Sequence, residues 1–135
     1  MNENKLKHLE FVQGVINRMA RNSFLIKGWS VTLVAAIFAL AAKDANTQIV
    51  IIAYIPVIVF WFLDTYFLRQ ERLYRKLYDD VRGKEPSTVD FSLNATAYQK
   101  EVASFICVMF SVTLRWFHGF LLIAVIAANY ITWRN

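Results

Sequence analysis

The sequence is poor in the residues that build disulfides, metal sites and tight turns. Its 135 residues include one cysteine, two histidines, two prolines and four glycines. A lone cysteine, Cys107, excludes an internal disulfide, and His8 and His118 are too far apart in the chain to suggest a metal-ligand cluster. A phosphate-binding glycine loop and a nucleophile with a matching base are also missing. We therefore expect no cofactor, no metal and no enzymatic activity.

Charged side chains are absent from three long stretches. Asp, Glu, Lys and Arg are missing from Gly28–Ala42, Ala45–Leu63 and Trp116–Trp133. Each stretch approaches or matches the roughly 20 mostly apolar residues that cross ~30 Å of hydrocarbon as a helix. Because 57% of the residues are hydrophobic, a soluble domain of this size could not bury all three stretches. The sequence predicts an all-α integral membrane protein.

The first half of the chain predicts an antiparallel transmembrane hairpin. Residues 1–22 carry apolar side chains every three or four positions, which is typical of an amphipathic helix. They lack the apolar core of a signal peptide, so we expect the first span to be retained. The spans of the hairpin are expected at 24–42 and 48–68, joined by a short turn at 43–47. Residues 22 and 23 either break the first helix or mark its entry into the membrane.

The second half predicts a cytoplasmic extension, a linker and a third span. A helical stripe continues through 69–82, so the second span and its extension form one long helix that Pro56 is expected to kink and Gly83 to end. Residues 83–97 are the linker. Within 98–135, we expect an interfacial helix at 98–115 and a third span at about 116–133. The alternative is a re-entrant hairpin turning at Gly119.

The distribution of positive charge predicts the orientation. The net charge is +5. Five basic residues precede the first span, one lies between the first two spans, and seven follow the second span up to Lys100. Basic residues accumulate on the cytoplasmic side of membranes. The N-terminus and the segment around 69–100 are therefore expected in the cytoplasm, with the 43–47 turn outside.

Lys27 and Asp64 are expected to form an intramembrane ion pair. Lys27 lies 16 residues before Lys43, and Asp64 lies 16 residues after Gln48. In a tight hairpin both lie about 24 Å below the outer turn, at ~1.5 Å per residue. Isolated charges at that depth are costly, so they should pair or face water. The pair either fixes the register of the hairpin or belongs to a polar gate.

A stripe of polar side chains recurs at helical spacing in the expected interfacial helix. Such a face either packs against another helix or lines a pore. Both interpretations require a partner helix and favour a homo-oligomer. The members of this polar stripe are Lys100, Ser104, Cys107, Ser111, Arg115 and His118.

A basic patch follows the second span. Basic residues just inside a membrane contact anionic lipid headgroups or a partner. Membrane lipids are therefore the expected partners, and nucleic acid is not expected as a direct ligand. The residues of this basic patch are Arg69, Arg72, Arg75 and Lys76.

The first 80 or so residues resemble a group of small bacterial membrane proteins. The layout of residues 1–82, a cytoplasmic helix, a tight hairpin and a second cytoplasmic helix, also resembles that of SLATT-like effectors of bacterial anti-phage systems. The similar segments are Phe11-Val12-Gln13, Arg18-Met19-Ala20-Arg21-Asn22-Ser23, Lys27-Gly28-Trp29, Phe60-Trp61, Leu63-Asp64, Leu68-Arg69-Gln70-Glu71-Arg72 and Leu77-Tyr78.

This resemblance implies a function that acts on the membrane. SLATT-like effectors are thought to form pores or perturb the membrane when an associated sensor is triggered. The chain is accordingly expected to be a homo-oligomeric effector of the bacterial inner membrane, with a soluble cytoplasmic sensor as a possible partner. Three spans of one protomer cannot enclose an aqueous path, so a pore requires several copies. The alternative is a membrane-anchored scaffold that recruits a soluble partner through its cytoplasmic helices.

Overall fold

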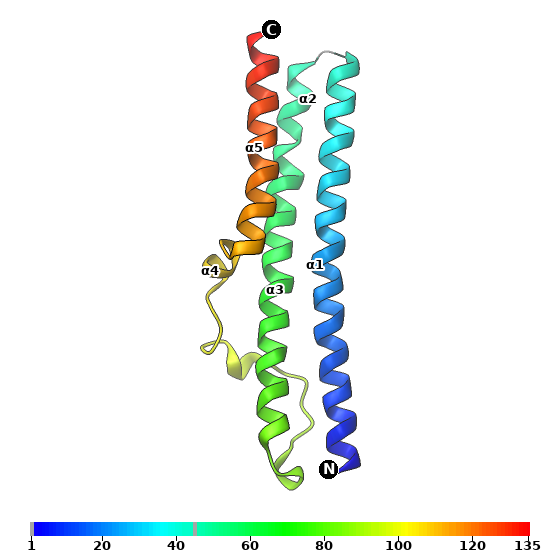
Figure 1. Ribbon diagram of the computed structural model, residues 1–135, viewed down its shortest axis with the longest axis vertical. Coiled ribbons are helices and arrows are strands. Elements are labelled where there is room, and N and C mark those ends of the chain that lie inside the picture. The colour runs from blue at the N-terminus through cyan, green and yellow to red at the C-terminus, as the bar shows by residue number, and fades with distance from the viewer. Residues whose placement is uncertain (1, 45) are drawn as a thin grey trace.

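The protein is a long, narrow bundle of helices. The computed structural model describes residues 2–44 and 46–135, so Met1 and Ala45, in the middle of the expected turn, lie outside the described residues. No strand occurs in this described part. Figure 1 shows two antiparallel rods running the length of the molecule, with a third helix beside the upper part of them. The elements are α1 (Glu3–Asp44), α2 (Thr47–Ile52), α3 (Tyr54–Gly83), η1 (Pro86–Thr88), η2 (Thr96–Tyr98), α4 (Phe105–Met109) and α5 (Val112–Arg134).

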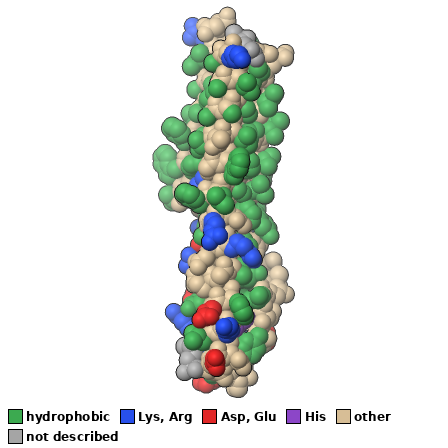
Figure 2. All heavy atoms as spheres, turned by 90° about the vertical axis from the view of Figure 1, so that its right-hand side faces the viewer, with side chains coloured by type: hydrophobic (Ala, Val, Ile, Leu, Met, Phe, Trp, Pro, Cys, Tyr) green, Lys and Arg blue, Asp and Glu red, His purple; other side chains and the backbone are tan. Residues whose placement is uncertain are grey.

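Three helical segments are long and apolar enough to cross a membrane. They are Glu3–Lys43, Gln48–Gly83 and Val112–Arg134. Hydrophobic side chains cover most of the upper part of the face in Figure 2, whereas charged side chains are concentrated on its lower part. The all-helical fold is therefore confirmed, and the three candidate spans are consistent with a multi-pass membrane protein.

The first rod is a single uninterrupted helix. The expected amphipathic helix and the expected first span merge into α1, with no break at Asn22 or Ser23. Serine destabilises helices when its hydroxyl bonds to the nearby backbone. In this structure the Ser23 hydroxyl instead donates to Asp64 on the neighbouring rod. The interpretation of residues 22 and 23 as a helix break is therefore wrong.

The second rod is interrupted once and ends where expected. A turn at Ala53 separates α2 from α3. Pro56 has no N–H to donate to the carbonyl of Ile52, so the helix loses a hydrogen bond directly beside this turn. Downstream, α3 runs without a break to Gly83, which confirms the expected terminator.

The last third departs from the sequence-based expectation. A continuous helix over 98–115 was expected, but the chain forms η2, a turn, the five-residue α4 and then α5. Ser104 and Ser111 have extended backbones and occupy the N-cap positions of α4 and α5, which serine strongly favours. Each serine therefore starts a new helix. Gly119 lies inside α5, so no re-entrant hairpin turns there.

The lower ends of the two rods form a hydrophobic core of their own. The apolar side of α1 packs against the lower half of α3, and the linker after Gly83 closes over them. Leu9, Val12 and Ile16 of the expected apolar face are buried, whereas Leu6 is exposed and Lys5 and His8, expected on the polar side, are buried. The buried members are Leu9, Val12, Ile16, Leu73, Leu77, Val81, Val89 and Ala95.

Lys5 fastens the beginning of α1 to the end of α3. The side chain is 6% exposed, and its Nζ donates to the carbonyls of Arg82 at 2.9 Å and Lys84 at 2.6 Å. Carbonyls at a helix end have no partner within the helix and carry partial negative charge. The Lys5 ammonium therefore satisfies two of them.

We expect Lys5→Met to loosen the last turn of α3. Losing charge-assisted hydrogen bonds should cost about 1–2 kcal/mol locally, so the amides of that turn should exchange hydrogen roughly tenfold faster. Exposed Lys7 is the matched control, and Lys7→Met should leave exchange unchanged. Equal effects of the two changes would contradict the anchoring role of Lys5.

Tyr98 holds the linker against α3, and its titration reports that contact. Its hydroxyl donates to Asp80 Oδ2 at 2.5 Å. Burial, followed by this hydrogen bond to a carboxylate, raises the pKa of Tyr98 to about 12. Because its pKa in the unfolded chain is near 10.0, Tyr98 contributes stability at lower pH that is lost as pH rises from about 10 to about 12.

We expect phenolate absorbance to show one tyrosine ionising well above the unperturbed value. Asp80→Asn should bring the pKa of Tyr98 down because it removes the negative charge, and Tyr98→Phe should remove the late transition. Asp79→Asn, one residue away on an exposed face, should leave the titration unchanged. A late transition that persists in Tyr98→Phe belongs to another tyrosine.

Candidate functional site

A cluster of buried polar side chains joins the three candidate spans. At its centre is Asp64 of α3, whose side chain is 0% exposed. Lys27 Nζ of α1 lies 2.5 Å from Asp64 Oδ2, and the Ser23 hydroxyl, also from α1, donates to Oδ1. From α5, His118 Nε2 lies 2.8 Å from Oδ2. One carboxylate therefore contacts donors from two other helices.

Helical periodicity explains why α1 supplies two of these groups. Ser23 and Lys27 are four residues apart, so they lie one turn from each other on the same face. Lys27 Nζ also donates to the Ser23 hydroxyl at 2.9 Å. The contact between Lys27 and Asp64 that their equal depth predicts is present in the structure. Their arrangement supports the interpretation that the pair fixes the register of the hairpin.

His118, which is expected from the sequence to belong to the polar stripe, lies in this cluster instead. It is 0% exposed, its ring stacks on Trp61 with centroids 5.8 Å apart, and Phe117 meets it edge-on at 5.0 Å. A signal for its position was available in the sequence. Counting down from Trp133 places His118 about 23 Å below the outer end of the third span, at ~1.5 Å per residue. That depth matches the depth of Lys27 and Asp64.

Trp61 connects the cluster to the segment before α5. Its indole Nε1 donates to the carbonyl of Met109 at 2.8 Å, and its ring also meets Phe110 edge-on. These contacts hold the end of α4 against α3, directly below the point where α5 begins. His118 is therefore positioned by both its own helix and the loop that precedes it.

The arrangement suits structural cohesion better than catalysis. Nucleophilic sites place a hydroxyl on the base and a carboxylate behind that base. Here the Ser23 hydroxyl bonds to the carboxylate, and His118 Nδ1 has no partner in the described part of the chain. The described residues also contain no group of three His, Cys, Asp or Glu side chains suited to a metal.

The expected polar stripe does not form one face. Because Ser104 and Ser111 begin separate helices, the spacing of its members no longer follows one helical period. Lys100, Cys107 and Arg115 are exposed at different points, whereas His118 is fully buried. The expected single helical face over Lys100, Ser104, Cys107, Ser111, Arg115 and His118 is therefore wrong, whereas a role of these residues at a subunit interface or in a pore stays a prediction.

The residues of the basic patch have different surroundings. Arg69 donates to the carbonyls of Ala103 at 3.1 Å and Gln99 at 3.4 Å, so it fastens the segment between η2 and α4 to α3. Arg75 pairs with Glu71 at 2.8 Å, and Lys76 is exposed. Arg72 lines a pocket beside the buried cluster. The patch is not a uniform solvent-facing surface.

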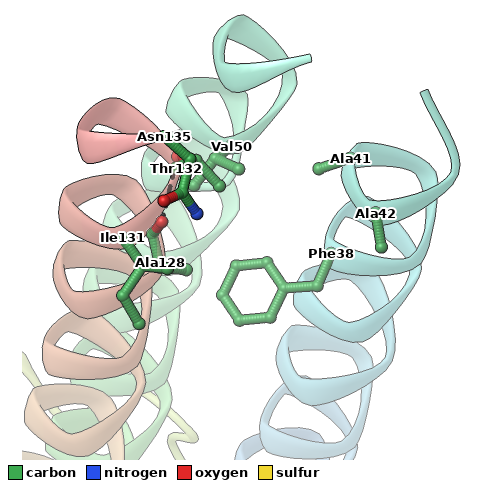
Figure 3. Close-up of a pocket in the computed structure, with 8 residues that line it drawn as sticks. All are labelled: Phe38, Ala41, Ala42, Val50, Ala128, Ile131, Thr132 and Asn135. Carbon is green, nitrogen blue, oxygen red and sulfur yellow. Dashed lines mark hydrogen bonds between the residues drawn. The ribbon is translucent and has the colours of Figure 1, made fainter. Parts of the chain in front are cut away.

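The upper end of the bundle in Figure 1, near the end of α1 and the start of α2, contains a groove. This groove of about 510 Å³ lies between α1, α2 and α5. In Figure 3 the Phe38 ring points from α1 into this space, towards Ala128 and Ile131 on α5. Ala41 and Ala42 border it with side chains too short to fill it. The polar cluster therefore lies at the opposite end of the spans from the groove.

Comparison with known proteins gives no family assignment: no family model, curated protein or solved structure matches the chain.

We expect Asp64→Ala to destabilise the protein strongly. It leaves the Lys27 ammonium and the His118 and Ser23 donors without their acceptor, at a cost of about 3–5 kcal/mol for a broken buried pair. Unfolding of the variant in mixed micelles should show this loss of stability. In a double-mutant cycle, Lys27→Ala with Asp64→Ala should couple strongly.

The matched control is the surface pair Asp79 and Arg82, which are 3.7 Å apart and more than 60% exposed. A cycle on this pair should give a coupling of about 0–1 kcal/mol. An Asp64 variant no less stable than Asp79→Ala would show that the cluster does not hold the spans together.

Proposed function

We propose that the chain is a non-enzymatic, homo-oligomeric protein of the bacterial inner membrane that permeabilises the membrane, as an effector of anti-phage defence. One observation carries the proposal. Helices α1 and α3 run without interruption from the lower core into the candidate spans, and the Asp64 cluster joins them to α5 where the two halves meet. A displacement at the lower core would therefore be carried along α1 and α3 to the depth of the Asp64 cluster.

The proposed orientation places the lower core in the cytoplasm. The five-one-seven distribution of basic residues supports this orientation. In Figure 2 charged side chains are likewise concentrated on the lower part of the face shown. A cytoplasmic sensor would then find both rods and the linker within reach, which suits a triggered effector.

Permeation would require several copies of the chain. Within one copy, the polar side chains of the cluster bond to one another and join the three helices at that depth. The outward sides of the spans carry exposed apolar residues such as Trp29, Ile55 and Phe120, which suit lipid or a neighbouring subunit. A water path would have to form between subunits, and this supports a homo-oligomer.

An apolar pocket in the lower half favours a second candidate function, recruitment of a soluble partner. The pocket has a volume of about 360 Å³ and is bordered by Phe11, Phe91 and Leu93, each at least 43% exposed. Phe91 adopts a φ of 58°, which is unfavourable for a non-glycine residue. Such a backbone conformation is maintained only by its surroundings. A membrane-anchored scaffold would use this surface.

We expect overproduction of the intact chain to depolarise cells, and the purified protein to release dye from liposomes. Replacing exposed Arg18 and Arg21 together by glycine should weaken both effects, because two glycines soften α1 by about 1 kcal/mol each relative to alanine. The Arg18→Ala, Arg21→Ala pair removes the same charges and should keep both effects.

Two results would contradict the permeabilising role. One is a membrane potential and a dye content unchanged by the correctly inserted protein. The other is equal activity of the glycine and alanine pairs, which would separate permeation from the continuity of α1. If the inactive protein captured a soluble partner, and Phe91→Ser abolished that capture, the scaffold function would replace the first proposal.

A further inference from the structure

A pocket beside the Asp64 cluster is lined by basic side chains and by the start of a helix. It has a volume of about 420 Å³ and lies between α1, α3 and the first turn of α5. Lys27 borders it from α1, Arg72 borders it from α3, and residues 111–114 border it from α5. Lys27 is paired with Asp64, whereas Arg72 faces no carboxylate in the lining, so the charge that favours an anion there comes from Arg72.

The first turn of α5 has unused hydrogen-bond donors. In a helix the first N–H groups have no partner within the helix and carry partial positive charge. Ser111 sits at the N-cap, but its side chain accepts no capping hydrogen bond. Its Oγ is buried and has no partner in the described part of the chain. The N–H groups of Val112, Thr113 and Leu114 therefore lack the usual cap in this 23-residue helix.

The two cations also have N–H donors without a partner among the described residues. An ammonium has three N–H donors, and Lys27 directs Nζ to Asp64 and Ser23. The Arg72 guanidinium makes no hydrogen bond or ion pair with the described residues, although the side chain is half-buried. Its neighbours are both paired, Arg69 with the Ala103 carbonyl and Arg75 with Glu71. Arg72 is thus free to bind a ligand.

We propose that this pocket binds a phosphate group, through the Arg72 guanidinium, the Lys27 ammonium and the backbone N–H groups that begin α5. A guanidinium fits two phosphate oxygens at once, and an uncapped helix N-terminus adds further N–H donors. Two sources share this chemistry, a phospholipid headgroup and free phosphate. The pocket lies at the depth of Lys27, near the lower end of the apolar spans, where headgroups would lie. The inference holds whether or not the protein forms a pore.

The test uses the full chain in detergent micelles and follows its unfolding temperature. Inorganic phosphate and a short-chain phosphatidylglycerol are titrated separately, with chloride at matched ionic strength as the reference. Both wild type and Arg75→Gln should be stabilised, whereas Arg72→Gln should need about tenfold more of the ligand, because it loses charge-assisted hydrogen bonds. Arg75 is the matched control because it is one turn from Arg72 and does not line the pocket.

A response to the lipid alone assigns the site to a headgroup, and a response to inorganic phosphate assigns it to the free anion. A third variant, Ser111→Asp, places a fixed carboxylate at the helix start. It should raise the unfolding temperature without ligand and abolish the response. The proposal is overturned if chloride stabilises as well as phosphate, if neither ligand acts, or if Arg72→Gln and Arg75→Gln respond alike.

Discussion

The carboxylate of Asp64 is the group on which the arrangement of the helices depends. A charge removed from water is costly unless it is paired and its oxygens accept hydrogen bonds. Asp64 is fully buried among helices that are otherwise apolar, and its hydrogen bonds reach α1 and α5. A slip of either helix by one residue would rotate a donor away from the carboxylate. Apolar contacts tolerate such slips far better, so the cluster sets the register.

The two halves of the molecule are stabilised by different means. The lower half has the conventional core of a water-soluble helix pair, with Leu9, Val12 and Ile16 facing Leu73, Leu77 and Val81. The upper half has a smaller buried apolar cluster, centred on Val34, Val57 and Val125, and many large apolar side chains remain exposed. Lipid tails are as apolar as these side chains, so burying them gains little within a membrane. Polar contacts therefore have more influence on how the spans pack.

The sequence predicted those features that depend on long runs of residues and on the distance of a residue from the hairpin turn. Absence of charge located the spans, and residue counting from the hairpin turn brought Lys27 to Asp64. The sequence was less informative where two local preferences, continuing a helix and capping a new one, competed. The polar stripe assumed one helical period from Lys100 to His118, but Ser104 and Ser111 take N-cap conformations and reset that period twice. His118 was assigned to the stripe, although the same depth count that paired Lys27 with Asp64 places it in the cluster.

The position of the cluster relates the packing of the spans to the lower half of the molecule. Below it, Arg69 ties α3 to the segment before α4, and Trp61, one turn above Asp64, ties α3 to Met109 just before α5 begins. The loop that leads into α5 is therefore held against the same helix that carries Asp64. Because α3 continues unbroken to Gly83, a movement of its lower end changes the position of the carboxylate relative to both Lys27 and His118. The groove at Phe38, by contrast, lies at the far ends of α1 and α5, where no polar side chain of the cluster holds the helices together.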